Sequence, residues 1–168
     1  AASDVYKRQN KHFWGSILIP NLTFNALQNG LGHFGVASKS NKTRHVDTLG
    51  VSFDSSASLL TCFVIKSECE QIIECLGESG RISFYVGMVS HEAYNFKGQF
   101  VNFNSISEND SKLSKEYRNN VINTISNIGI SIEAATEKYG KVPDTAITFK
   151  VDKVFIQTPG PDAGKLIN

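Results

Sequence analysis

The chain has 168 residues, of which 40% are hydrophobic and 20% are charged, and its formal net charge at pH 7 is +1. These values are ordinary for a globular domain and give no reason to expect nucleic acid or an anionic membrane surface as a partner. The longest apolar run, SLLTCFVI at residues 58–65, is far shorter than the roughly 20 residues of a membrane-spanning helix.

The first nine residues, AASDVYKRQ, differ from the rest of the chain. They are polar, show no hydrophobic periodicity and resemble translated adaptor sequence. We expect residues 1–9 to be a non-native leader and residues 10–168 to form one domain.

The first half of this domain alternates between apolar segments and polar turns. Period-two alternation predicts strands, and apolar residues at helical spacing predict helices. The expected elements are a helix at 22–28, strands at 33–38, 44–53 and 59–65, and a helix at 67–76. For the second helix, Ser67 is the expected N-cap and Gly77 is expected just past the end.

The second half contains two long segments with alternating side chains, and glycine or proline residues interrupt or end them. The expected elements are strands at 81–89 and 90–103, helices at 107–127 and 130–139, and a final strand through 147–156. Gly98 interrupts the second of these strands and indicates a bulge or a close approach of another backbone. The sequence TPGP at 158–161 must end the last strand. Ser107 or Asn109 is the expected cap of the first helix.

These elements predict an α+β domain, mainly β, with about six strands and three or four helices. Hairpin-like turns between most strands favour antiparallel pairing. Closing so few strands into a barrel removes their exposed edges, so we expect a six-stranded barrel.

The chain has three cysteines, Cys62, Cys69 and Cys75. Their number is odd, and no two of them form a C-x-x-C pair. Neither a disulfide framework nor a zinc site is therefore expected, and a reduced, cytoplasmic setting is the default. His33 and His45 are not at metal-ligand spacing, so no metal site is expected. No catalytic triad with an identifiable context is present, and the catalytic residues stay open.

Several local sequences, in this order, resemble the pyridoxamine 5'-phosphate oxidase-like family, the FMN-binding split barrels. They are RHVD at 44–47, LLTCFVIKS at 59–67, ESGRISFYV at 78–86, SHEAYNFKGQF at 90–100 and FIQTPGPDAG at 155–164. The last is similar to the ending of an uncharacterised branch of the family. The resemblance covers residues 22–164 and implies a six-stranded antiparallel Greek-key split β-barrel, with peripheral helices, that forms a homodimer.

The resemblance also implies two equivalent FMN sites at the dimer interface. The cofactor-binding residues that it implies are Arg44, Val64, Ile65, Lys66, Ser67 and Lys97. A phosphate dianion needs Arg, Lys or hydroxyl donors, and backbone N–H groups at the start of a helix add more. We therefore expect the phosphate beside Lys66, Ser67 and Arg44.

The implied function is that of an FMN-dependent oxidoreductase that transfers hydride to or from a small organic substrate, with NAD(P)H as the candidate electron donor. Pyridoxamine phosphate oxidation itself is not expected, because Ala93 stands where the oxidases have a glutamine and their C-terminal substrate segment is missing. Three alternatives stay open: a flavin- or haem-type binding protein without turnover, a cofactor-free structural homodimer, and the use of a deazaflavin.

Overall fold

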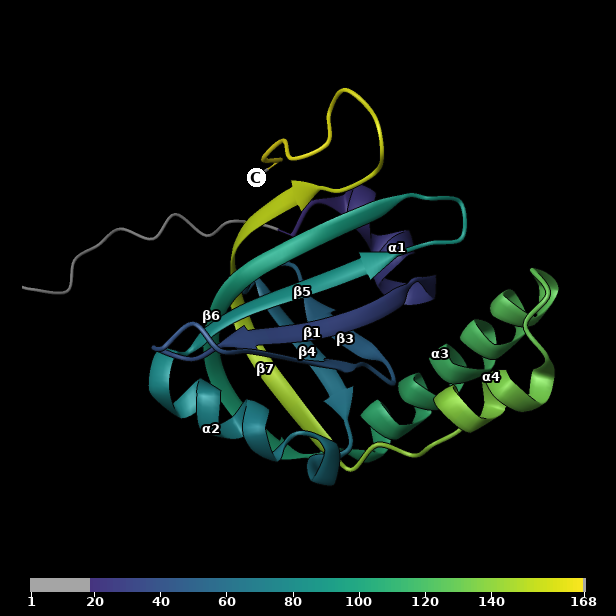
Figure 1. The fold of residues 1–168 in the computed structure, drawn as a ribbon, viewed down its shortest axis with the longest axis horizontal. Coiled ribbons are helices and arrows are strands. Elements are labelled where there is room, and N and C mark those ends of the chain that lie inside the picture. Colours follow the sequence, from purple (N-terminus) through teal and green to yellow (C-terminus); the bar gives the residue numbers. More distant parts are fainter. Residues whose placement is uncertain (1–18, 168) are drawn as a thin grey trace, which may run out of the picture.

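The computed structural model describes residues 19–167, so the expected leader at residues 1–9 lies outside the described part. This part forms one antiparallel sheet with helices around it (Figure 1). The strands are β1 Leu31–Ala37, β2 Thr43–Asp47, β3 Val51–Asp54, β4 Leu59–Val64, β5 Arg81–Gly87, β6 Ala93–Ser105 and β7 Thr145–Ile156. The helices are α1 Phe24–Asn29, α2 Glu70–Ser79, α3 Glu108–Asn127 and α4 Ile132–Tyr139, with short 3-10 turns η1 Asn21–Thr23 and η2 Lys66–Glu68.

The strands lie in the order β2-β1-β5-β6-β7-β4-β3, and every neighbouring pair is antiparallel. The expected α+β class and antiparallel pairing are therefore confirmed. The register between β6 and β7 shifts at Lys97/Gly98, which confirms the bulge expected at this glycine. The long strands β6 and β7 curve around the other strands (Figure 1).

The expected number of six strands is wrong for the described residues, because the expected strand at 44–53 is divided into β2 and β3. The division has a physical cause at residues 48–50. The backbone N–H of Thr48 donates to Gly32 of β1, whereas that of Leu49 donates to Phe63 of β4. At this point the chain stops pairing with β1 and begins to pair with β4. β2 and β3 are the strands at the two ends of the sheet. Within residues 19–167 no backbone hydrogen bonds pair these two strands, and only residues 48–50 link them.

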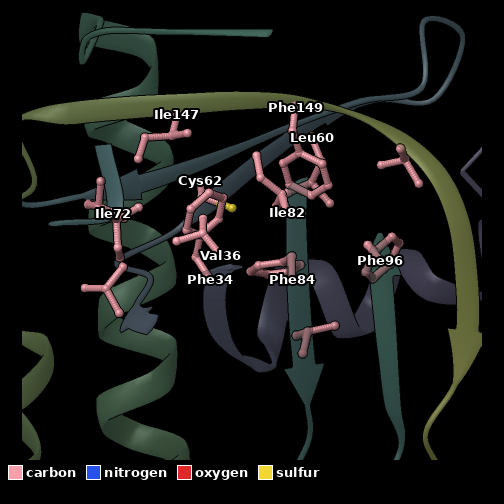
Figure 2. Packing of buried hydrophobic residues seen from close by; sticks show 14 of the residues in the cluster. Phe34, Val36, Leu60, Cys62, Ile72, Ile82, Phe84, Phe96, Ile147 and Phe149 are labelled. Carbon is pink, nitrogen blue, oxygen red and sulfur yellow. The ribbon is translucent and has the colours of Figure 1, made fainter. Parts of the chain in front are cut away.

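The inner face of the curved sheet holds the main hydrophobic core. Figure 2 shows apolar side chains from β1, β4, β5, β6 and β7 gathered in this core, with phenylalanines from β1, β5, β6 and β7 among them. Five phenylalanines in this interior and in β4 have no exposed surface: Phe34, Phe63, Phe84, Phe96 and Phe149. Alternation along β1 buries every second residue, so the intervening residues face outward.

The helices cover the sheet at two places. Helix α2 packs against β1 and β2, and α3 and α4 form a hairpin over a second apolar cluster centred on Tyr117 and Tyr139. Ser107 caps α3 in a capping box with Asp110, as expected. The expected Ser67 cap is wrong, because α2 begins after Cys69. The helix continues past Gly77 to Ser79, and Gly80 is its C-cap. No helix among the described residues is long and apolar enough to cross a membrane.

Candidate functional site

A straight row of outward-facing residues crosses four strands of the sheet. The strand register places Gly35 of β1 opposite both His45 of β2 and Ser83 of β5, and Ser83 opposite Lys97 of β6. The residues on either side of Gly35 in β1 are buried, so this row lies on the outer face. The middle of the row has almost no side-chain bulk.

A groove of 440 Å³ lies over this row, and we call it the outer groove. Small side chains and basic side chains both line the outer groove. The small residues are Gly35, Ala37 and Ser83, and the basic residues are Arg44, Arg81 and Lys97, with His45 beside them. No aspartate or glutamate of the described residues lines it. The outer groove therefore has a floor of small side chains and a lining that carries positive but no negative side chains.

Two of the three basic side chains contact neutral groups. The guanidinium of Arg44 donates to the side-chain oxygen of Gln71 in α2 and, at 2.9 Å, to the carbonyl of Thr43. The ammonium of Lys97 lies 5.3 Å from the ring centroid of Phe155. These neutral partners position the cations without neutralising them, so both remain available to an anion.

The structure brings Arg44 and Lys97 together but places the other expected site residues elsewhere. Val64 is fully buried in the core, and Ile65 packs against the cluster beneath α3 and α4. Lys66 lines a separate pocket of 360 Å³ with Asp144. Ser67 lies in the same 3-10 turn as Lys66 and does not line the outer groove.

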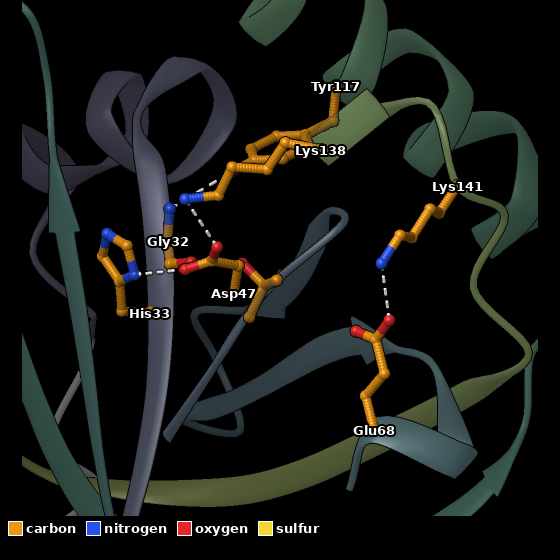
Figure 3. A network of polar contacts seen from close by, with 8 residues as sticks. Gly32, His33, Asp47, Glu68, Tyr117, Lys138 and Lys141 are labelled. Atoms are coloured by element: carbon orange, nitrogen blue, oxygen red, sulfur yellow. Dashed lines mark hydrogen bonds and ion pairs between the residues drawn. The ribbon is translucent and has the colours of Figure 1, made fainter. Parts of the chain in front are cut away.

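Carboxylates occupy the places around Lys66 where an anion would bind. The backbone N–H of Lys66 donates to Asp144 Oδ1 at 2.8 Å. Lys141 reaches from beyond α4 to pair with Glu68 Oε1 at 2.7 Å (Figure 3). An added phosphate would meet these negative charges at close range, so the strand-to-helix junction is a poorer anion site than the outer groove.

A charged network that the sequence did not indicate lies beside the outer groove. His33 Nδ1 of β1 lies 2.6 Å from Asp47 Oδ1 of β2, and Lys138 Nζ of α4 lies 2.8 Å from Asp47 Oδ2 (Figure 3). The hydrogen bond from His33, followed by that from Lys138, holds the pKa of the Asp47 carboxyl well below its usual range. The carboxylate is therefore ionised at all physiological pH values.

One signal in the sequence could have revealed part of this network. Residues 33–37 and 43–47 pair symmetrically about the polar turn between them, and this register places His33 opposite Asp47. Lys138 could not have been found in this way, because it comes from a helix about 90 residues further along the chain. Only the packing of the helical hairpin against β1 and β3 brings it to Asp47.

Tyr117 of α3 fixes the hairpin to the start of β1. Its buried hydroxyl donates to the carbonyl of Gly30 at 2.7 Å and accepts from the N–H of Gly32 at 3.1 Å. Burial raises the pKa of the Tyr117 phenol, so the group stays neutral. The strand that carries His33 and Gly35 is thereby held to the helices that carry Lys138.

Comparisons with known proteins identify the fold. No protein-family model matches the sequence, and no curated protein matches it. Among solved structures, the Group A Streptococcus protein HupZ is similar with a TM-score of 0.56 and 12% identity, over 88% of this chain and all of that one. A candidate pyridoxamine 5'-phosphate oxidase from Lactobacillus delbrueckii is similar with a TM-score of 0.52 and 12% identity, over 82% of this chain and 93% of that one. The chain therefore shares the fold of these two proteins.

Proposed function

We propose that the chain binds flavin mononucleotide in the outer groove and is a flavin-dependent oxidoreductase acting on a small organic molecule. The observation that carries the proposal is the outer groove, where Arg44, Arg81 and Lys97 accompany a floor of small residues without a carboxylate. A planar ring system needs a flat floor, and a phosphate dianion needs cationic donors. The fold shared with a candidate pyridoxamine 5'-phosphate oxidase supports the same ligand class.

The dimensions of the outer groove fit this ligand. Its 440 Å³ lies within the range of about 300–1,000 Å³ that is typical of small-molecule sites. A Cβ added at Gly35 would meet no atom nearer than 3.4 Å, so the packing of the sheet does not itself require a glycine there. The open space above Gly35 is thus available to a ligand ring.

The lining residues would bind and orient the cofactor, and the cofactor would supply the chemistry. Arg81 and Lys97, on the neighbouring strands β5 and β6, would hold the phosphate. The floor around Gly35 and Ser83 would support the ring, and Arg44 would lie at the opposite edge of that floor. The bound flavin would supply the hydride chemistry, with NAD(P)H as the proposed electron donor. The expectation that Val64, Ile65, Lys66 and Ser67 also contact the cofactor stays a prediction, and Lys66→Ala tests it for the lysine.

A non-catalytic flavin- or haem-type binding protein is the second candidate. Ala93 favours it, because this residue lies buried at the start of β6 and offers no polar side chain to a ring. The free, buried state of Cys62, Cys69 and Cys75 agrees with the cytoplasmic setting that we propose for either function.

Titration of FMN with the purified protein tests the proposed function. We expect flavin fluorescence to change saturably, and NADH or NADPH to bleach the bound flavin under anaerobic conditions. The variant Gly35→Val should fill the outer groove and abolish binding while it keeps its melting temperature, because the sheet has room for the added Cβ and valine suits a strand.

The results of this titration separate the candidates. Binding without bleaching by either nucleotide would favour the binding protein over the oxidoreductase. If the wild-type protein binds no FMN, or if Gly35→Val binds it as well as the wild type does, the outer groove is not the flavin site.

We further propose that the chain forms a homodimer through the end of β6. Beyond Gln99 this strand has left β5, and its apolar residues Val101 and Phe103 are 47% and 44% exposed. Exposed apolar patches of this kind commonly mark interfaces.

Light scattering should give twice the 18.5 kDa of one chain. Phe103→Glu should give a monomer, whereas Ile128→Glu, at an exposed apolar residue after α3, should not. A monomeric wild type would contradict the proposal.

A further inference from the structure

The cations that line the outer groove lie at its two ends rather than in one cluster. Arg44 lies on β2, whereas Arg81 and Lys97 lie on β5 and β6. The sheet order β2-β1-β5-β6 places β1, with Gly35 in the floor, between Arg44 and the other two. Neighbouring strands are about 4.8 Å apart, so the backbone of β2 is about 10–14 Å from those of β5 and β6.

The partners of two of these cations hold them apart. The guanidinium of Arg44 donates to Gln71 of α2, the helix that packs against β1 and β2. The ammonium of Lys97 lies over the ring of Phe155 in β7, on the side of β6 away from β5. Each side chain is thus held by an element beyond its own end of the groove, and a single small anionic group would not contact both. We call the two places the Arg44 end and the Arg81–Lys97 end.

The two ends differ in charge. The Arg81–Lys97 end has two cations, which suit the phosphate dianion of FMN. The Arg44 end has one, and on its other side Arg44 lines a second pocket together with Glu74 and Glu78 of α2. No ion pair joins Arg44 to a carboxylate within residues 19–167, but these two negative charges oppose the binding of a dianion more strongly than that of a monoanion. The Arg44 end therefore suits a single carboxylate.

The guanidinium of Arg44 has donors left for such a group. An arginine side chain has five N–H donors. The contact with Gln71 uses the Nε donor, and the 2.9 Å contact with the carbonyl of Thr43 uses one on Nη1. Three donors remain on Nη1 and Nη2, and two of them can bind the two oxygens of one carboxylate side by side. The apolar side chains of Val36, Ala37 and Ile82 line the same groove and suit the rest of a small organic acid.

We propose that the substrate of the flavin-dependent reaction is a small organic acid, and that Arg44 is the specificity-determining residue that binds its carboxylate. The acid would lie at the end of the outer groove opposite the flavin phosphate, with its apolar part directed toward the floor. The inference rests on the proposed function for the identity of the cofactor, whereas the carboxylate site itself depends only on residues of this chain.

Titration with benzoate tests the inference, because benzoate combines a flat apolar ring with one carboxylate. Benzamide has nearly the same shape without the charge. In the FMN-saturated protein, benzoate should shift the Nε–H signal of Arg44 in proton–nitrogen NMR spectra, and benzamide should bind about tenfold or more weakly than benzoate. The same signal can be followed in the flavin-free protein.

Variants separate a specific carboxylate contact from a general loss of positive charge. Arg44→Gln should weaken benzoate binding about tenfold or more and keep its melting temperature, because this side chain is exposed. Arg44→Lys, which keeps the charge but not the paired donors, should recover part of the affinity. Lys42→Ala is the matched control. Lys42 lines the pocket with Glu74 and Glu78 but not the outer groove, so its loss should leave benzoate affinity unchanged.

The failures of the two proposals can be told apart. If Arg44→Gln binds benzoate as tightly as the wild type does, or if benzamide binds as tightly as benzoate, the carboxylate site is overturned and the flavin site is left intact. If Arg44→Gln loses as much FMN affinity as Arg81→Ala does, with riboflavin unaffected, Arg44 binds the phosphate and the inference is overturned as well. A protein that binds no FMN contradicts the proposed function, and the Arg44 signal in the flavin-free protein then still decides whether the carboxylate site exists.

Discussion

Lys97→Ala is expected to weaken FMN binding about 10- to 150-fold. A charge-assisted contact to a phosphate is worth about 1.5–3 kcal/mol, and each 1.4 kcal/mol is about a factor of ten in affinity. Arg81→Ala should have an effect of the same size, because Arg81 lies on the neighbouring strand β5 and lines the same outer groove. Riboflavin, which has no phosphate, should bind both variants nearly as well as it binds the wild type. Fluorescence titration with the two flavins measures the difference.

Two lysine variants make this experiment selective. Lys153 of β7 pairs with Lys97 in the strand register but does not line the outer groove, so Lys153→Ala should leave FMN affinity close to that of the wild type. Lys66→Ala tests the strand-to-helix junction. A large loss in Lys66→Ala with none in Lys97→Ala would place the phosphate at that junction. Equal losses for FMN and riboflavin would move Lys97 away from the phosphate.

Gly98→Ala is expected to destabilise the fold by at least about 3 kcal/mol. A Cβ at this bulge would lie 2.0 Å from the carbonyl oxygen of Lys150 and 2.8 Å from its carbonyl carbon. Both are backbone atoms of β7, so the clash can be relieved only by moving the strand, which exceeds the usual cost of an overpacked side chain. Urea unfolding measures the free energy, and failure to obtain folded protein would be the extreme form of the same result.

Gly77→Ala is the matched control for this substitution. Gly77 lies within α2, and a Cβ there would meet no atom within 4 Å. Alanine should therefore stabilise the helix by about 0.5–1 kcal/mol, because glycine loses more backbone entropy on folding. If the two variants unfold at the same urea concentration, the close approach at Gly98 is not what requires a glycine.

Local features were predictable from the sequence where neighbouring residues supply the physical cause. Ser107 caps α3 through hydrogen bonds within one turn, and the glycine at position 98 marks the bulge of β6. Side-chain alternation likewise placed the long strands and the residues that face the core. The end of α2 was misjudged at Gly77, because a glycine costs a helix only about 1 kcal/mol relative to alanine, so a single glycine need not end it.

The sequence by itself determined the α+β class, the antiparallel pairing and the approximate positions of most elements, because periodicity and capping act over a few residues. The tertiary structure alone decided which cations share a site. Arg44, Arg81 and Lys97 line one groove because strand pairing places β2, β5 and β6 in one sheet, whereas Lys66 faces Asp144 elsewhere. It also decided that Lys138 reaches Asp47. Contacts between residues so distant along the chain depend on how whole elements pack, and no local pattern records that packing.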